Sequence, residues 1–406
     1  MGYKRQALAG LSYMGGLRVL TRAISYGKIA ILARLLTPEQ FGLFGIASLV
    51  MAFLEIITET GVNVFLIQEK GDIKGYINTA WAVSICRGAV IALFIALTSP
   101  LVASFFQNSN STNLILLISV IPLIRAFINP AVVTLQRDLK FKSEFCLRTV
   151  IFLVETIVSI TFAFYLKNAS SLIYGLIAAA ALEVIITQIF IKPRPRFELD
   201  FEKVKKVIKR GKWITIAGTS NYFVEHLDDT LVGRLVGTSA LGIYQMAYKI
   251  SLLPLTEISQ VVSMVTFPVY VKIADDKQRL KSAFAKTSLA TTILATAFGI
   301  FLYVSAPIVV NILLGEKWQE VTPLLKVLAI FGIFRAISSV QFTLFNSLKK
   351  QRLVATSLFI EFFALLIIIV PFITKFGTIG AAYAALFASI VPLPFIARAS
   401  YQILKN

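Results

Sequence analysis

Long runs of apolar residues, separated by short polar connections, follow one another along the whole chain. Twelve of these runs are long enough to cross a bilayer as a helix, which takes about 20 residues. Their approximate bounds are 13–36, 42–66, 77–99, 114–134, 147–166, 171–191, 213–236, 243–271, 287–307, 321–345, 353–374 and 378–397. The pattern therefore predicts an all-α polytopic membrane protein with twelve transmembrane helices.

The second half of the chain repeats the first. The segment from Arg34 to Phe44 reappears as the segment from Arg234 to Tyr244, at an offset of 200 residues. Later matches pair Pro100 with Pro307, Arg125 with Arg335, Glu155 with Glu361, and Gly175 with Gly380. Because each half holds an even number of spans, the halves are predicted to be two parallel-related six-helix bundles. The predicted domains are an N-terminal bundle (1–191), a basic cytoplasmic linker (192–212) and a C-terminal bundle (213–406).

Composition agrees with a membrane protein, and the distribution of charge adds an orientation. The chain is 57% hydrophobic and only 15% charged, with a net charge of +19. The basic residues gather in alternate connections, whereas the other connections carry only Lys167, Lys317 and Lys375. By the positive-inside rule, both termini and the basic linker are expected to be cytoplasmic. Topology and contact with anionic membrane lipid account for these basic loops, so nucleic acid is not an expected partner.

Several other classes of protein do not fit the sequence. The first apolar run is interrupted by Arg18, Arg22 and Lys28 and has no small-residue cleavage site, so a retained helix is expected rather than a signal peptide. Cys86, Cys146 and the single His226 are too scattered to predict a disulfide or a metal site. No nucleotide-binding loop or catalytic triad pattern is present. An enzyme, such as a polytopic glycosyltransferase or polymerase, is therefore the weaker interpretation.

Five short segments carry a family resemblance. They are 33–42 (ARLLTPEQFG), 135–141 (LQRDLKF), 228–234 (DDTLVGR), 241–248 (LGIYQMAY) and 253–255 (LPL). They resemble the polysaccharide exporter branch, with its O-antigen and colanic-acid flippases, of the multidrug/oligosaccharidyl-lipid/polysaccharide superfamily. The resemblance implies a V-shaped, MATE-like pair of bundles that moves an undecaprenyl-pyrophosphate-linked oligosaccharide across the bacterial inner membrane by alternating access. It also implies glycosyltransferases and a polymerase as partners, and no cofactor beyond a coupling H⁺ or Na⁺.

Basic residues of the first span are the candidate ligands for such an anionic cargo. Arg18 and Arg22 are four residues apart and project from one helical face. They either contact pyrophosphate or extend to the cytoplasmic headgroups, and the sequence leaves both interpretations open. Lys28 is equivalent in the repeat to Asp228. This equivalence predicts an ion pair between the halves, either static or made and broken during transport.

The seventh span carries a polar stripe. Gly218, Asn221, Glu225, Asp228 and Asp229 recur at helical spacing and share one face. Because carboxylates rarely face hydrocarbon, these residues are expected to face a cleft or a partner. Asn221 is then a candidate cleft residue, and the three carboxylates are candidates for coupling or gating.

Carboxylates in the second span allow two interpretations. Glu55 and Glu59 either bind a coupling proton or cation, or pair with Arg18 or Arg22, and pairing is favoured. Separately, the matched positions in the two halves predict two intrabundle salt bridges, Arg125 with Glu155 and Arg335 with Glu361. The acidic seventh span keeps a cation-coupled multidrug exporter of the same superfamily as the alternative function.

Overall fold

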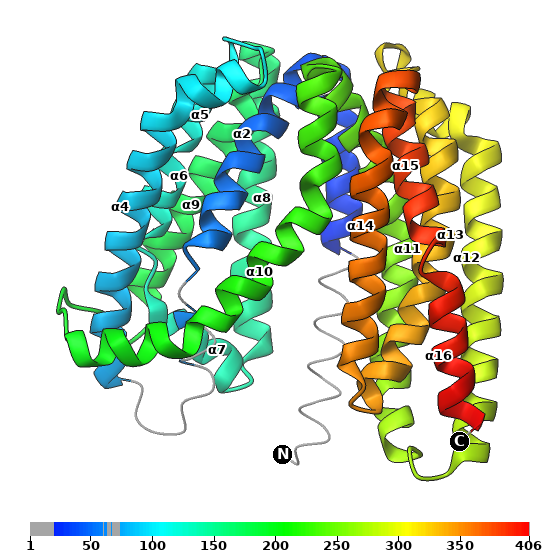
Figure 1. Ribbon diagram of the computed structural model, residues 1–406. Coiled ribbons are helices and arrows are strands. Elements are labelled where there is room, and N and C mark those ends of the chain that lie inside the picture. Colours follow the sequence, from blue (N-terminus) through cyan, green and yellow to red (C-terminus); the bar gives the residue numbers. More distant parts are fainter. Residues whose placement is uncertain (1–19, 60, 63–65, 67–73, 406) are drawn as a thin grey trace. The chain divides into compact units, whose positions relative to one another are not determined.

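The computed structural model describes residues 20–59, 61, 62, 66 and 74–405. Every regular element in these residues is a helix (Figure 1), as the apolar pattern predicts. The chain divides into two compact units, Met1–Leu227 and Asp228–Asn406. The division falls inside one long helix, α10 (Phe201–Leu235). The predicted domain boundaries, which follow the repeat and assign this whole span to the second half, stay a prediction.

Unit 1 is built from helices that run back and forth. Its first described residues, 20–35, are helical. The elements that follow are α2 (Pro38–Ile57), α4 (Lys74–Phe105), α5 (Ser111–Ile118), α6 (Val120–Arg125), η1 (Pro130–Val133), α7 (Thr134–Arg137), α8 (Phe141–Leu166), α9 (Ser170–Phe190) and most of α10. Helix α4 packs against α5 and α6, and α8 packs against α9.

Unit 2 continues from the last residues of α10. Its elements are α11 (Thr238–Lys272), α12 (Lys277–Leu313), η2 (Glu316–Trp318), α13 (Val321–Ser347), α14 (Gln351–Phe376), α15 (Thr378–Ile390) and α16 (Leu393–Lys405). Helix α13 lies at its centre, packed against α11, α12 and α15. The helix is interrupted between α15 and α16, at Val391 and Pro392, because proline cannot donate the backbone hydrogen bond that would continue it.

Local sequence explains where the helices begin. Thr37 caps α2 by accepting a hydrogen bond from the Gln40 backbone N–H at 3.4 Å, and Pro38 occupies the first helical position. Asp200 performs the same role for α10 by accepting from the Lys203 N–H at 3.2 Å. The hydrogen bonds and positive charge of Lys203 lower the pKa of Asp200 below its ordinary value.

Nine helices of the described chain are long and apolar enough to span a membrane. Residues 111–125 and 130–137 form a pair bent by 73° that makes a tenth if it is counted as one span. The two remaining predicted spans are helical where the structure describes them, but residues 20–35 begin at the limit of the described chain and α10 is rich in charge. A polytopic all-α membrane protein is thus confirmed, whereas the count of twelve stays a prediction.

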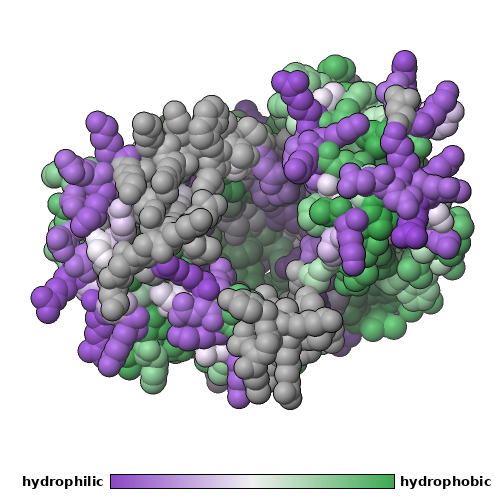
Figure 2. Space-filling view, turned by 90° about the horizontal axis from the view of Figure 1, so that it is seen from below, coloured by the Kyte–Doolittle hydropathy of each residue, from purple (hydrophilic) through white to green (hydrophobic). Residues whose placement is uncertain are grey.

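Basic and uncharged connections lie at opposite ends of unit 1. In Figure 1 the connections 106–110 and 167–169 lie at the upper end of the helices, and 138–140 and 191–200 lie at the lower end. The lower connections are those rich in Lys and Arg. Seen from below, hydrophilic side chains gather over the helix ends (Figure 2). The alternation of charge therefore agrees with the direction of the helices, while the assignment of the lower end to the cytoplasm stays a prediction.

Two glycines that the repeat pairs with each other occupy close helix contacts. A Cβ on Gly175 would lie 1.9 Å from Ser159 Oγ and 2.7 Å from the Glu155 carbonyl oxygen, so α9 approaches α8 closely at this residue. A Cβ on Gly380 would lie 2.0 Å from the Phe372 carbonyl oxygen, on α14. Small residues allow such approaches between membrane helices. Both units thus use this glycine for a close approach to the preceding helix, although the residues that it meets are not equivalent in the repeat.

Gly175→Ala is expected to lower the free energy of unfolding by about 2 kcal/mol, because the added methyl group meets backbone that cannot rotate away. Gly75→Ala is the matched control, since a Cβ on Gly75 in α4 has nothing within 4 Å. That change should be neutral or stabilise the protein by up to about 1 kcal/mol through helix propensity. Both values are measured by detergent-induced unfolding followed by circular dichroism. Equal effects of the two substitutions would contradict the packing argument.

Candidate functional site

Several ion pairs join described segments of unit 1 within their apolar stretches, and three of them make up the candidate site. Lys28 Nζ, in helical residues 20–35, donates to Glu155 Oε1 of α8 at 2.6 Å. Arg125 Nη1, at the end of α6, donates to Glu55 Oε1 of α2 at 3.4 Å. The third pair joins Arg87 of α4 to Glu59, and its Nη2 to Oε2 distance is 3.6 Å. We call these six residues the ion-pair cluster.

The ion-pair cluster contains equal numbers of positive and negative side chains, which satisfies the strong requirement for pairing within a membrane. The side chains of Lys28 and Glu155 are 14% and 20% exposed, and those of the other two pairs are between 25% and 39% exposed. A partly exposed Arg–carboxylate or Lys–carboxylate pair can exchange its carboxylate for another anion, such as a phosphate oxygen. The cluster can therefore bind an anion where that anion takes the place of one of its carboxylates.

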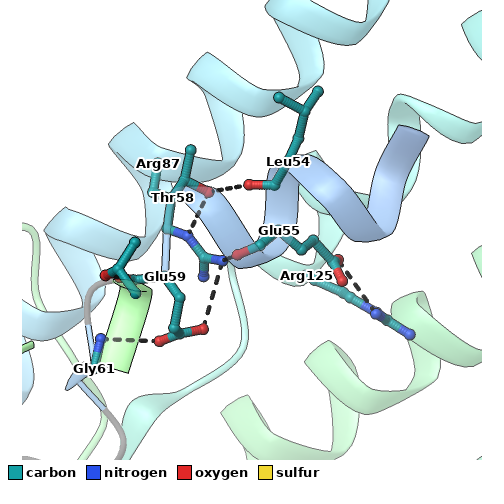
Figure 3. Close-up of polar contacts among 8 residues, drawn as sticks. Leu54, Glu55, Thr58, Glu59, Gly61, Arg87 and Arg125 are labelled. Carbon is teal, nitrogen blue, oxygen red and sulfur yellow. Dashed lines mark hydrogen bonds and ion pairs between the residues drawn. The ribbon is translucent and has the colours of Figure 1, made fainter. Parts of the chain in front are cut away.

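Arg87 also holds the end of α2, as Figure 3 shows. Its Nε donates to Thr58 Oγ1 at 3.1 Å, and its Nη2 donates to the Glu55 carbonyl oxygen. Thr58 is the C-cap of α2, a helix with no basic residue in its own last turn. A cation supplied by α4 thus lies beside the negative end of the α2 dipole. Glu59 completes this arrangement by accepting from the Gly61 N–H at 3.0 Å.

Arg87→Gln is expected to lower the free energy of unfolding by about 2 kcal/mol, because it removes charge-assisted hydrogen bonds to a side chain and to a helix carbonyl. Arg148→Gln serves as the control in the same unit. Arg148 is half exposed and makes one 3.2 Å contact with Glu183, so its loss should cost less than about 1 kcal/mol. Unfolding in mixed detergent micelles gives both values. Equal losses would show that the capping contacts of Arg87 add nothing.

Unit 2 contains a different polar group, formed around Asp228 near the end of α10. Asp228 is 5% exposed and Tyr244 of α11 is fully buried. The Tyr244 hydroxyl donates to Asp228 Oδ2 at 2.7 Å, and the Asp229 backbone N–H donates to Asp228 Oδ1 at 2.9 Å. A carboxylate at this depth requires such donors. We call Asp228 and Tyr244 the buried acid pair.

A row of aromatic contacts leads from the buried acid pair to an ion pair on α13 and α14. The Tyr244 ring lies 6.0 Å from that of Tyr248, and the Tyr248 ring lies 5.9 Å from that of Phe331. The guanidinium of Arg335 stands 5.7 Å from the Phe331 ring. Arg335 Nη1 donates to Glu361 Oε1 at 3.2 Å, which confirms the predicted salt bridge in the second half. These residues form one continuous path across unit 2.

The predicted salt bridge of the first half, between Arg125 and Glu155, is wrong. Glu155 instead binds Lys28, and Arg125 turns to Glu55. The repeat explains the difference between the halves. The position of Lys28 is taken in the second half by Asp228, so Glu361 has no lysine there and binds Arg335 instead. The position of Glu55 is taken by Leu255, a residue that is almost fully buried.

The structure places the other candidate residues as follows. Glu55 and Glu59 are paired, as favoured, but their partners are Arg125 and Arg87 rather than Arg22. Arg18 lies outside the described residues, and Arg22 is half-buried in helical residues 20–35. The ion pair predicted between Lys28 and Asp228 would join the two units, and it stays a prediction. Each of these two residues has a partner inside its own unit.

On α10 the predicted polar stripe is divided by burial. Asn221 and Glu225 are exposed, Asp229 is half-buried and Asp228 is buried. A Cβ on Gly218 would lie 3.2 Å from the side chain of Ile56, so this glycine serves packing against α2. The roles of these residues in binding and coupling stay predictions.

Arg87 of the ion-pair cluster and Tyr244 of the buried acid pair had no role predicted from the sequence. Arg87 interrupts an apolar run of the sequence, and a charge in such a run is a signal that could have found it. Tyr244 replaces Phe44 of the first copy, at the same time as Asp228 replaces Lys28. The second copy thus gains a hydroxyl and a carboxylate at two positions where the first copy has neither. This joint change is the sequence signal that could have predicted the buried acid pair.

Comparisons with known proteins agree with this architecture. The family model described as polysaccharide biosynthesis protein matches residues 31–323. The lipopolysaccharide biosynthesis protein WzxC of Escherichia coli strain K12 is 22% identical over 341 residues, which cover 84% of this chain and 69% of that protein.

Among solved structures, the lipid II flippase MurJ in an inward closed conformation is similar to this chain with a TM-score of 0.78 and 15% identity, covering 95% of this chain and 87% of MurJ. An inward-facing multidrug transporter of the MATE family gives a TM-score of 0.67 and 13% identity, covering 95% and 96%. These two likenesses confirm the expected fold. The family match confirms the resemblance, and the chain therefore belongs to the polysaccharide biosynthesis protein family.

Proposed function

We propose that the protein is a flippase that moves a lipid-linked oligosaccharide across the bacterial cytoplasmic membrane. The observation that carries this proposal is the family match over residues 31–323. The similar proteins named above include one of lipopolysaccharide biosynthesis and one lipid II flippase. The cargo is proposed to be an undecaprenyl-pyrophosphate-linked repeat unit, moved by alternating access without a chemical step. Glycosyltransferases that build the unit and a polymerase that consumes it are the proposed partners.

The ion-pair cluster supplies the chemistry for the anionic end of this cargo. A pyrophosphate carries at least two negative charges and binds most strongly where cations are already oriented. We propose that it displaces Glu155 from Lys28, and that Arg22 and Arg18 contact the same group. Asn221 is proposed to donate to the sugar from α10. Both termini are proposed to be cytoplasmic, so that cargo loads from the basic side.

Coupling to an ion gradient is proposed to involve the buried acid pair. Glu55 and Glu59 already have arginine partners, so a proton or sodium ion would have to displace a guanidinium there. Asp228 accepts hydrogen bonds from a neutral hydroxyl and a backbone N–H. We propose that this carboxylate takes up the H⁺ or Na⁺, because such binding would neutralise a charge that is only 5% exposed.

Cargo recognition is tested by native mass spectrometry in detergent with an undecaprenyl-pyrophosphate oligosaccharide. The double variant Lys28→Met/Glu155→Leu removes the cation without leaving an unpaired charge, so it should fold. Its affinity for the cargo should fall at least tenfold, whereas Lys281→Met, at an exposed lysine of α12, should bind as wild type. Wild-type affinity in the double variant would show that Lys28 does not contact the pyrophosphate. Failure of the wild-type protein to bind any lipid-linked sugar would overturn the proposed function.

A further inference from the structure

The connection between α9 and α10 carries an unusual exposed surface. We call residues 190–203 the strap. Phe190, Phe197 and Phe201 are 76%, 61% and 79% exposed. The basic residues of the strap before α10, Lys192, Arg194 and Arg196, are also exposed. Three largely exposed phenylalanines within twelve residues are unfavourable in water, so an apolar environment is expected to cover them.

The exposure of these side chains does not result from a loose backbone, because unit 1 holds the strap in place. Asn129, which is fully buried, donates from its Nδ2 to the carbonyl oxygens of Ile191 and Pro193, at 3.1 Å each. Asn78 of α4 accepts from the Arg196 backbone N–H at 2.9 Å and donates to Glu198 at 2.8 Å. The strap is therefore a built element whose aromatic and basic side chains are presented outward.

Charge indicates what covers this surface. Residues 192–212 contain nine basic and three acidic residues, a net charge of +6. In Figure 1 the first turns of α10 run across the lower ends of the neighbouring helices before the helix turns upward. This is the end of unit 1 where the basic connections lie, and Figure 2 shows the hydrophilic side chains gathered there. Aromatic rings beside Lys and Arg at the end of transmembrane helices match the boundary between acyl chains and headgroups.

We propose that the strap is a binding surface for anionic phospholipid at the basic face of the membrane. The phenylalanines insert among the upper acyl carbons, and Lys192 and Arg196 contact the headgroup phosphates. Arg194 has a different task, since its Nε donates to the Gln188 carbonyl oxygen and so caps the end of α9. The occupant is a membrane lipid rather than the transported cargo, and the proposal does not depend on the proposed function.

The test places a reporter in the strap. Phe197→Trp is reconstituted into vesicles that contain brominated phosphatidylglycerol or brominated phosphatidylcholine at equal mole fraction. Bromine quenches tryptophan fluorescence on contact, and the wild-type protein, with its three native tryptophans, provides the background to subtract. Quenching by the anionic lipid is expected to be at least twice that by the zwitterionic lipid. The difference should shrink in high salt, because exposed charges are screened.

Two charge variants in the Phe197→Trp background complete the test. Lys192→Gln/Arg196→Gln should remove the preference for phosphatidylglycerol, since each cation near a membrane surface strengthens binding about fivefold. Lys349→Gln/Lys350→Gln removes the same charge from an exposed connection in unit 2 and should leave the preference unchanged. Equal quenching by both lipids, or loss of the preference in both double variants, would overturn the proposal. Absence of quenching by either lipid would mean that something other than the bilayer, such as a protein partner, covers the strap.

Discussion

Lys28→Met is expected to lower the free energy of unfolding by about 3 kcal/mol, because it leaves the Glu155 carboxylate partly buried without its cation. Glu155→Leu alone should be similarly damaging. The double variant Lys28→Met/Glu155→Leu should recover most of the loss, since it leaves no unpaired charge. Detergent-induced unfolding of the four proteins gives the coupling energy directly.

A control and a contrary outcome make this prediction specific. Lys281→Met removes a positive charge from an exposed position and should change the free energy of unfolding by less than about 0.5 kcal/mol. If the losses of the two single variants simply add in the double variant, Lys28 and Glu155 do not interact. The assignment of Lys28 to an intrabundle pair would then have to be abandoned.

The second large effect concerns the buried acid pair. Asp228→Asn is expected to abolish the stimulation of transport by an imposed proton or sodium gradient while cargo binding stays measurable. The change removes the charge but keeps an oxygen that accepts from Tyr244, so the fold should survive. Tyr244→Phe should reduce transport about tenfold, because removing a hydrogen bond to a buried carboxylate costs about 1.5–3 kcal/mol.

The matched controls for this prediction lie on the same helix and in the ion-pair cluster. Glu225→Gln, at an exposed residue of α10, should keep the response to the gradient. Glu55→Gln should also keep it, because Glu55 is already paired with Arg125. Loss of the gradient response in Glu55→Gln but not in Asp228→Asn would move the coupling site into unit 1. Transport is measured in vesicles with the gradient imposed in either direction.

Sequence predicted the helices well because the signals involved are local. Apolar length and the repeated glycines Gly175 and Gly380 each depend on a few neighbouring residues or on direct repetition. Local sequence also explains why two of the predicted spans are not found as single long apolar helices. Charge lowers the apolar character of α10, and Pro130 begins a new helix after the break that follows Arg125.

Pairing between charged side chains was predicted less well, because it depends on which of several charged residues on neighbouring helices lie at the same level along those helices. Glu155 had two possible cations, Arg125 and Lys28, and the assumption that both halves pair alike selected the wrong one. The repeat contains a signal for the correct pairing, because the counterpart of Lys28 in the second half is Asp228, which is not basic. Differences between the two copies were therefore more informative about the site than their similarities.

The measurement that tests the central proposal most directly is a flipping assay in proteoliposomes. A lipid-linked oligosaccharide, labelled in the sugar, is incorporated on one side, and its arrival on the other side is followed with a membrane-impermeant sugar oxidant. Purified protein should make the sugar accessible from the opposite side far faster than protein-free vesicles do. Uptake of a cationic dye in the same vesicles should be unchanged. Rapid dye uptake with no movement of the sugar would contradict the proposed function and favour a multidrug exporter.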